Sequence, residues 1–473
     1  MRIAPAGLRA RCTAIGGLVV VGAELGCLDP RLADAPSEHA PDLWDRLGPA
    51  PDEHEDQDDD QDQEGVHVAD GTPPRSAIVP GVPAETVAPP LLVYGPRSTT
   101  YDFGPTHPLT PRRFGPGISL LEALGAVPNL APEPATDAEL EWIHEPGYLR
   151  IVKQFSRNPL GGWQAGIGPG DTPAFAGMHE ASAAVAGGSL RAMEAILRGA
   201  VTHAFHPGGG LHHAMPARAS GFCVYDDPAL AIARARRDGL RVMYIDLDVH
   251  HGDGVQAIHW ADPDVLTVSI HERGHSLFPG TGFADEIGGP GAEGTKVNIA
   301  LDAGTGEIGW VEALEIVLPP LAAAFQPEII VSQHGADAHA FDPLAHLLVT
   351  TTAMGRLARL VDGLAHQHAA GRWLATGGGG YDVYRVVPRV WANVWLAQSH
   401  VTPLGELPPA WRDRWATEAE RYGQAPIPTS LDDPENAGLP YARAQAHADE
   451  RASVIAHDAL DRVLPLLTAR DAR

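Results

Sequence analysis

Two stretches of the chain place carboxylates and imidazoles directly after short apolar runs. The first reads RVMYIDLDVHHGDG over 241–254, and its polar residues are Asp246, Asp248, His250, His251 and Asp253. Alternation along an extended strand puts Asp246, Asp248 and His250 on one side. Charged groups at the end of an apolar strand are costly unless something compensates them, and a divalent metal does so. This stretch therefore predicts a metal site.

The second stretch reads IIVSQHGADAHAFDPL over 329–344, and its candidate ligands are His334, Asp337, His339 and Asp342. Asp337 follows Gly335-Ala336, a tight turn that can present a carboxylate to a neighbouring strand end. Two strand ends that both carry ligand-type residues favour one shared site.

Two glycine runs carry further polar residues. GGGLHHA over 208–214 presents His212 and His213, whose imidazoles titrate near neutrality and suit acid/base work beside a metal. GGGGYD over 377–382 presents Tyr381, whose hydroxyl can donate to a developing oxyanion, and we expect Gly377–Gly380 to make this loop mobile. A phosphate-binding loop is disfavoured, because neither G-x-G-x-x-G spacing nor a following Lys-Ser or Lys-Thr is present.

The elements that must position these residues alternate along the chain. Strands are predicted at 200–205, 241–246, 265–270, 328–332 and 373–376, and helices at 180–197, 228–237, 309–324 and 347–367. This order predicts an α/β fold, a central parallel sheet flanked by helices on both faces. Ligands of such sheets bind beyond the carboxyl ends of the strands, where the polar residues lie.

The composition of the chain disfavours several classes of protein. The 473 residues include 34 basic and 60 acidic ones, a formal net charge of −26, which disfavours binding to nucleic acid. Three cysteines, Cys12, Cys27 and Cys223, are too few for a disulfide framework or a Cys-rich zinc module. No apolar run approaches 18 residues, so no membrane-spanning helix is expected. The oligomeric state is not predicted.

Three regions are expected along the chain. Residues 1–90 form an acidic and proline-rich extension, with nine acidic residues in the thirteen positions 52–64, and we expect it to be disordered. Residues 91–400 form the catalytic domain, and 401–473 a helical segment packing on it. Arginines before the apolar run 14–23 are reminiscent of a signal peptide, but Glu24 argues against a lipoprotein signal, and we expect a cytoplasmic protein.

The combined motifs resemble the zinc-dependent histone deacetylase superfamily. HHA, DxDxHHGDG, FPGTG, GAD and GGGGY occur in the family's order within 91–398, and THPLTPRR, SIHE and QHGADAH are similar to the bacterial acetoin-utilisation branch. The resemblance implies a single arginase/deacetylase-like domain and three metal ligands, Asp248, His250 and Asp337. It implies that zinc is bound, with ferrous iron or cobalt as alternatives.

The resemblance also assigns roles around the metal. His213 matches the general base that deprotonates the attacking water, and His212 its neighbour, which assists in protonating the leaving amine. Asp246 and Asp253 match the carboxylates paired with His212 and His213, and such partners fix the tautomer. Tyr381 matches the hydroxyl that polarises the acetyl carbonyl.

Further residues are assigned to the substrate and to a second ion. The residues matched to substrate binding are Asp171 at the rim, Gly221, Phe222 and Phe278 in the tunnel, and Leu344 and Gly379. A structural K⁺ or Na⁺ site corresponds to Asp246, Asp248, His250, Ser269 and Ile270. Arg113 matches a basic residue near an acetate-release channel.

The expected function is hydrolysis of the acetyl amide of acetyl-lysine in proteins. The resemblance implies an acetylated protein substrate such as an acyl-CoA synthetase, with no nucleic-acid or membrane partner. The alternatives are a small-molecule amidohydrolase acting on acetylpolyamines and a catalytically silent binding module. Leu344 disfavours polyamines, because an apolar residue offers no partner for a second ammonium. The presence of all candidate catalytic residues disfavours silence.

Overall fold

The computed structural model describes residues 89–402, 405–433 and 442–470. Nearly all of the acidic extension, including the apolar run 14–23, lies outside these residues. Seven strands form one sheet in which every pair is parallel, in the order β1-β2-β7-β6-β3-β4-β5. The strands are β1 (Leu91–Leu92), β2 (His203–His206), β3 (Val242–Asp246), β4 (Val265–Glu272), β5 (Lys296–Leu301), β6 (Ile329–Gln333) and β7 (Trp373–Thr376).

The strands are apolar on both faces because both faces of the sheet are covered. In β3, Met243 and Ile245 pack into one hydrophobic cluster, whereas Val242 and Tyr244 pack into the other. A strand buried on both sides shows a continuous apolar run rather than alternation. That run continues without a break to Asp246, so the change to polar residues marks the sheet edge at which the site is built.

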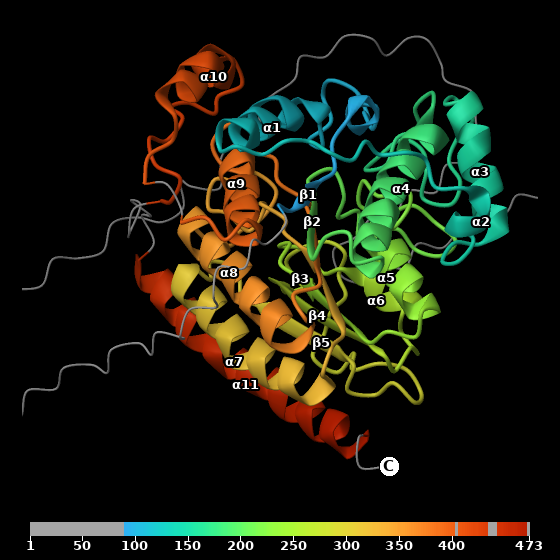
Figure 1. Cartoon of the computed structure of the whole chain (residues 1–473), viewed down its shortest axis with the longest axis vertical. Helices are drawn as coiled ribbons and strands as arrows, with labels where there is room; N and C mark the ends of the chain where they lie inside the picture. The colour runs from blue at the N-terminus through green and yellow to red at the C-terminus, as the bar shows by residue number, and fades with distance from the viewer. Residues whose placement is uncertain (1–88, 403–404, 434–441, 471–473) are drawn as a thin grey trace, which may run out of the picture. The chain divides into compact units, whose positions relative to one another are not determined.

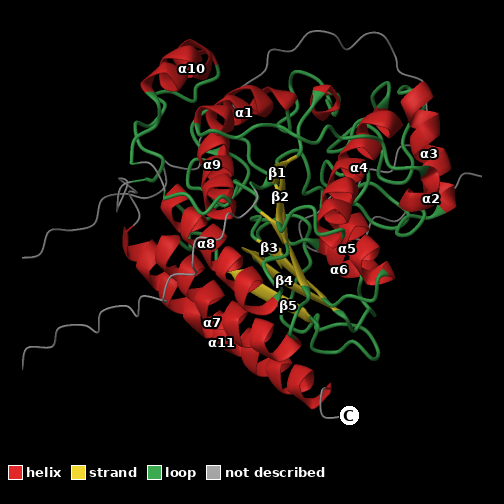
Figure 2. Ribbon diagram, viewed as in Figure 1, coloured by secondary structure: helices red, strands yellow, loops and turns green. Residues whose placement is uncertain are grey.

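Helices form a layer on each face of the sheet (Figures 1 and 2). One layer contains α4, α5 and α6, and the other contains α7, α8, α9 and α11. The helices are α1 (Phe114–Ala123), α2 (Asp137–Leu140), α3 (Pro146–Arg157), α4 (Met178–Leu197), α5 (Asp227–Arg237), α6 (Asp253–Ile258), α7 (Glu307–Phe325), α8 (Thr351–His368), α9 (Val387–Gln398), α10 (Pro409–Arg421) and α11 (Ala442–Arg470), with short 3₁₀ turns at Pro96–Thr99 and Pro111–Arg113.

Helix α7 is long and apolar enough to cross a membrane, which differs from the expectation of no such segment. Many of its side chains, however, are buried inside the protein. Trp310, Leu314, Leu318 and Leu321 are buried, and the helix packs on α8, α11 and β4. A helix that is apolar nearly all round is typical of a buried position in a large core. We therefore interpret α7 as a core helix.

The segment after residue 400 contributes to the same core. Helix α11 lies along α7 and β5 and buries Ala452, Ala456, Val463 and Leu467 against them. Helix α10 reaches α1, where the indole N–H of Trp411 donates to Pro116 O at 2.9 Å. These contacts come from apolar residues at helical spacing, as expected for a packed helix.

Candidate active site

Three neighbouring strands end beside one another and deliver most of the candidate residues. Asp246 is the last residue of β3, paired with Gln333 at the end of β6, which is in turn paired with Thr376 at the end of β7. The loops that follow carry Asp248, His250, Asp337 and Tyr381. Because the strands are parallel, their polar continuations meet at one edge of the sheet.

Asp248, His250 and Asp337 come together as the sequence predicts. One potential ligand atom from each lies within 4.8 Å of the others, and all three residues are buried. His250 Nδ1 lies 3.0 Å from Asp248 Oδ1 and 3.1 Å from Asp337 Oδ2. Two buried carboxylates and an imidazole that converge on one point form a ligand set with room for a further ligand.

Backbone and side-chain donors fix these carboxylates. The amide of Gln333 donates to Asp248 Oδ2 at 2.6 Å, and Gly379 N–H donates to the same oxygen at 2.8 Å. Val249 N–H donates to Asp337 Oδ1 at 3.1 Å. Such outer partners orient ligands. Gln333 was missed from the sequence, although its place in QHGAD directly before the candidate ligands was a usable signal.

His212 and His213 stand side by side beside the three ligands. Their Nε2 atoms are 3.0 Å apart, and each Nδ1 faces its own carboxylate: Asp246 Oδ2 at 2.8 Å for His212 and Asp253 Oδ1 at 2.7 Å for His213. An ionised carboxylate only accepts, so both Nδ1 atoms carry the proton. Asp246 also accepts from the Tyr244 hydroxyl at 2.7 Å, a partner the sequence reading missed.

The two histidines differ in basicity. Burial disfavours the charged form of His212, but Asp246 and Asp248 outweigh it and raise its pKa to about 10. Burial lowers the pKa of His213 well below its usual value, and the positive charge of the neighbouring His212 lowers it further. The pair therefore holds a proton on His212 and leaves Nε2 of His213 unprotonated, as an acceptor 3.0 Å from Nε2 of His212.

Tyr381 lines the same narrow pocket. The residues around it are Leu109, Gly210, Leu211, His212, His213, Gly221, Phe222, Cys223, Asp248, His250, Gly378, Gly379 and Tyr381. Burial raises the pKa of the Tyr381 hydroxyl well above its usual value, and Asp337 and Asp248 add to this. The hydroxyl therefore keeps its proton and can donate it in a hydrogen bond.

The glycines before Tyr381 have a different role from the expected flexibility. A Cβ on Gly379 would lie 1.9 Å from Asp337 Oδ2, and one on Gly378 would lie 2.2 Å from Gln333 Nε2. The backbone of this loop is packed directly against the ligands, and only glycine permits that approach. Tyr381 itself is anchored, because its N–H donates to Asp342 Oδ2 at 2.9 Å.

Of the residues matched to substrate binding, Gly221, Phe222 and Gly379 line the pocket, and Phe278 packs against its His213. The Phe278 ring packs edge-on against His213, with centroids 5.0 Å apart, and the Phe222 ring against Tyr381, at 6.0 Å. A Cβ on Gly221 would lie 2.4 Å from His213 Cδ2, so glycine keeps this wall thin. Asp171, exposed at the rim, accepts from Gly221 N–H at 3.0 Å. Leu344 is half-buried and packs against the neighbouring core.

Phe222 adopts a left-handed backbone conformation, with φ of 68°. This is uncommon for a bulky residue and needs surrounding support. The Tyr101 hydroxyl donates to Phe222 O at 2.6 Å, and Phe222 N–H donates to Thr172 Oγ1 at 3.2 Å. These bonds hold one aromatic wall in an orientation that an unsupported loop would not keep.

The remaining assigned residues lie near the site in different ways. Ser269 is the β4 partner of Asp246 in the sheet, and Ile270 follows it, so the residues matched to a monovalent cation are adjacent. Arg113 is buried and donates to Gly378 O at 2.6 Å, behind the glycine loop.

Three of the candidates in the 329–344 stretch do not join the ligands. His334 Nε2 pairs with Ser332 Oγ at 2.8 Å, and His339 Nε2 pairs with Asp433 Oδ2 at 2.9 Å. Asp342 accepts from Tyr381 N–H, and burial beside Asp337 raises its pKa to about 8. Of the candidates in this stretch, Asp337 alone joins Asp248 and His250.

The three-residue group fits a divalent cation. Asp337 is fully buried, and burial together with the nearby charge of Asp248 raises its pKa above the usual range. Two carboxylates in such proximity repel each other unless a cation or proton lies between them. Two oxygens and one nitrogen are ligands that zinc, ferrous iron and cobalt all accept.

Comparison with known proteins identifies related chains. Residues 107–398 match the histone deacetylase domain. The acetoin utilization protein AcuC of Bacillus subtilis (strain 168) is 41% identical over 372 residues, covering 77% of this chain and 95% of that protein. The AcuC protein of Staphylococcus xylosus is 37% identical over 353 residues, covering 73% of this chain and 91% of that protein.

A solved structure of a histone deacetylase homologue complexed with SAHA is also similar. It superimposes with a TM-score of 0.68 at 28% identity and covers 77% of this chain and 100% of that chain. The fold, the matched domain and the AcuC relatives all agree with the resemblance carried by the sequence motifs, and the family is one of hydrolases that remove acetyl groups and generally use a metal. The chain belongs to the histone deacetylase family.

Proposed function

We propose that this chain removes the acetyl group from acetylated lysine side chains of proteins, with Zn²⁺ held by Asp248, His250 and Asp337. The observation that carries the proposal is that Asp248 and His250, which Asp337 joins in one group, line one narrow pocket together with His213, Tyr381 and Phe222. Such a pocket selects a long, thin side chain and excludes bulk water. A divalent ion bound there would polarise the acetyl carbonyl and lower the pKa of a water molecule.

The chain's own residues supply the rest of the reaction. His213 is neutral, and its Nε2 accepts the proton of the attacking water while Asp253 holds Nδ1–H. His212, held as an imidazolium by Asp246, stabilises the negative charge that develops and donates to the leaving lysine nitrogen. Tyr381 donates its hydroxyl hydrogen to the acetyl oxygen as that atom becomes an oxyanion. Acetate and the free lysine amine are the products.

The substrate would be an acetylated metabolic enzyme in the cytosol, such as an acyl-CoA synthetase. This part of the proposal rests on the AcuC resemblance and on the names of the relatives. The net charge of −26 favours neither histone-bound DNA nor an anionic membrane as a partner. Mass spectrometry of an acetylated acyl-CoA synthetase, before and after incubation with the enzyme, tests it. If this chain hydrolyses acetyl-lysine peptides but leaves the acetyl-lysine signal of the acyl-CoA synthetase unchanged, that synthetase is excluded as a substrate.

An assay of two substrates tests the reaction itself. Acetate release from an acetyl-lysine peptide is measured beside release from acetylspermidine, with His213→Gln as the inactive variant and His368→Gln, on the surface of α8, as the matched control. We expect the peptide to be hydrolysed faster, the His213 variant to lose activity and the control to keep it. Faster hydrolysis of acetylspermidine would favour the small-molecule alternative, and no hydrolysis of either would favour a binding module.

A further inference from the structure

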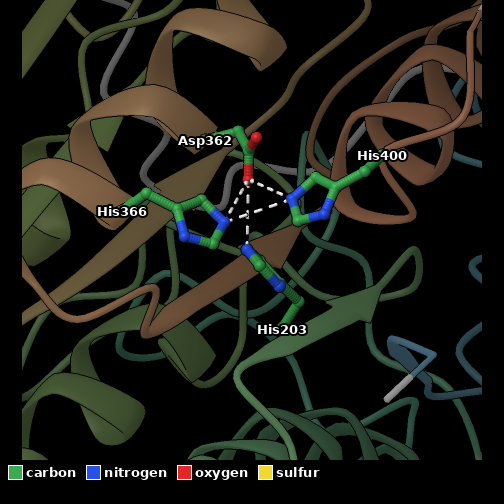
Figure 3. Close-up of side chains that lie close together, drawn as sticks. All are labelled: His203, Asp362, His366 and His400. Atoms are coloured by element: carbon green, nitrogen blue, oxygen red, sulfur yellow. Dashed lines mark hydrogen bonds and ion pairs between the residues drawn. The ribbon is translucent and has the colours of Figure 1, made fainter. Parts of the chain in front are cut away.

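A second cluster of ligand-type side chains lies at the opposite end of the sheet from the candidate active site. It consists of His203, Asp362, His366 and His400, whose polar tips point toward a common centre (Figure 3). His203 is the first residue of β2, and the loop that carries His212 and His213 follows the other end of that strand. The cluster is therefore separate from the group formed by Asp248, His250 and Asp337.

Three elements bring the four residues together. Asp362 and His366 are four residues apart on α8, so their side chains lie on one face of the helix. His400 follows the end of α9 in a left-handed conformation, with φ of 53°, which turns the chain toward α8. His203 enters from the sheet. The distance between these positions in the sequence explains why sequence reasoning missed the cluster, although the Asp-x-x-x-His spacing was a usable signal.

All four ligand atoms lie within 4.8 Å of one another, and four of the six distances between them are close to those around one tetrahedral ion. Asp362 Oδ1 lies 3.1 Å from His203 Nε2, 3.3 Å from His400 Nε2 and 3.5 Å from His366 Nε2. The Nε2 atoms of His366 and His400 are 3.1 Å apart. Ligands placed about 2.0–2.1 Å from a tetrahedral ion are separated by about 3.3 Å, which these distances approach.

The buried member of the cluster lacks a hydrogen-bond partner at the atom that faces the centre. His203 is 1% exposed, and its Nε2 makes no hydrogen bond in the part of the chain that the structure describes, although Asp362 Oδ1 lies 3.1 Å away. Its Nδ1 lies 3.2 Å from Thr202 Oγ1. When Nδ1 donates to that hydroxyl, the Nε2 lone pair is directed into the cluster, as for a metal-bound histidine.

His366 and His400 are exposed, so the cluster can be reached from the surface. The neighbouring surface pocket, lined by Arg359, Asp362, Leu396, Ala397, His400, Val401 and Thr402, gives an ion a route to the centre.

We propose that His203, Asp362, His366 and His400 form a second metal site, which binds one divalent transition-metal ion of the zinc type. Three imidazole nitrogens and one carboxylate oxygen complete a tetrahedral set with no open position. That arrangement is characteristic of structural rather than catalytic zinc. The ion would join the start of β2 to α8 and to the chain after α9, and so stabilise the fold at the end of the sheet remote from the pocket.

Metal content of the full chain tests the proposal. The protein is stripped with a chelator, dialysed against Zn²⁺ alone, and analysed for zinc per chain. We expect two equivalents in the unaltered chain. One equivalent is expected in Asp337→Asn, which lacks an active-site ligand, and one in either Asp362→Asn or His366→Ala. The matched control is His368→Ala, on the same helix outside the cluster, which should keep two equivalents.

A second measurement distinguishes a site from a fold defect. Zinc at a hundredfold excess over its Kd should raise the Tm of Asp337→Asn by about 3 °C, and the shift should vanish when His366→Ala is added. His366 and His400 are exposed, so their replacement leaves the core packing unchanged. Retention of two equivalents in both cluster variants, or one equivalent in the unaltered chain that Asp337→Asn abolishes, would overturn the proposal.

Discussion

Two histidines that are neighbours in the chain have opposite protonation because of what each one contacts. His212 pairs with Asp246 and lies near Asp248, whereas His213 pairs with Asp253 and is surrounded by other imidazoles. Burial favours the neutral form of both. The carboxylates of Asp246 and Asp248 outweigh it at His212, whereas at His213 the charge of His212 adds to it. The two Nε2 atoms, 3.0 Å apart, can thus act as a donor on His212 and an acceptor on His213.

Replacing Tyr381 by phenylalanine removes only one hydroxyl. Its backbone N–H still donates to Asp342, so the loop should keep its position. We expect turnover to fall by about 10²–10³-fold, since one oxyanion donor is lost. Metal content and Tm should change little, and KM should remain close to its original value. Steady-state kinetics on an acetyl-lysine peptide measure this effect, and near-normal turnover would remove Tyr381 from the mechanism.

The chemistry of individual residues could be read from the sequence to the extent that it depends on local spacing. Asp246, Asp248 and His250 are two positions apart at the end of one strand. This spacing places them on one side of the chain however the helices pack. The choice of Asp337 over His334, His339 and Asp342 rested instead on the resemblance, because the direction of each loop side chain is set by partners far away. Asp433, which binds His339, is one such partner.

At the scale of elements, the glycines of the loop after β7, Gly377–Gly380, allow close packing of its backbone. Its backbone contacts the carboxylates of Asp248 and Asp337 directly. The sequence suggested mobility, because a run of glycines removes side chains. The glycines are needed because the carboxylates of Asp248 and Asp337 lie so close to the loop backbone, and the sequence does not show that proximity.

Gly379→Ala tests this interpretation. The added Cβ would lie 1.9 Å from Asp337 Oδ2 and 3.0 Å from Asp248 Oδ2, so both carboxylates must move. We expect metal affinity and activity to fall by at least about 10–100-fold. Gly363→Ala on α8 is the control, since no atom lies within 4 Å of its Cβ. That change should stabilise the helix by about 0.5–1 kcal/mol. Equal metal affinity in both variants would contradict the packing role.

Asp433 connects α8, α9 and the loop after β6. It accepts from Arg389 Nη1 at 2.7 Å, from His339 Nε2 at 2.9 Å, and from the N–H and hydroxyl of Thr351 at 2.9 Å each. Burial alone would raise the pKa of Asp433, but His339 and Arg389 outweigh it and hold that pKa far below its usual value. Arg389 is fully buried, and Asp433 is the carboxylate that compensates its charge.

Asp433→Asn should lower the free energy of unfolding by about 3 kcal/mol at pH 7, because it leaves a buried charge uncompensated. The folded-state pKa is depressed, so the stabilisation is present above the unfolded pKa of about 3.9 and is lost as pH falls below it. Urea unfolding at several pH values measures the difference, with Asp432→Asn as the control. A difference that stays constant down to pH 3 would argue against the ion pair.

At the scale of the whole molecule, both faces of one parallel sheet are buried, and the pocket lies at the carboxyl ends of its strands. The sequence predicted five of the strands within a few residues, because their apolar runs are continuous. It did not predict β1 (Leu91–Leu92), which is too short to show a pattern, or β5 (Lys296–Leu301), whose buried Lys296 and Asn298 interrupt the apolar run. The Nζ of Lys296 donates to Val265 O at 2.6 Å, a compensation that sequence alone does not reveal.

The composition of residues 1–85 predicts that they are dispensable for catalysis. They are acidic and rich in proline, and such segments seldom contribute to a packed core. A chain that starts at Val87 should fold with an unchanged Tm and retain deacetylase activity. Thermal unfolding and the acetyl-lysine peptide assay provide the measurements. Aggregation or a marked loss of Tm would show that the extension belongs to the folded unit.

The pairing of α7 with α11 has a consequence for synthesis of the chain. A ribosome adds about 5–20 residues per second, so α7 emerges on the order of ten seconds before α11 is complete. During that interval the apolar surface that Val463 and Leu467 later cover is open to water. We therefore expect newly made chains to need a chaperone that covers this apolar surface until α11 is complete. A chain whose synthesis stalls before α11 should be prone to aggregation.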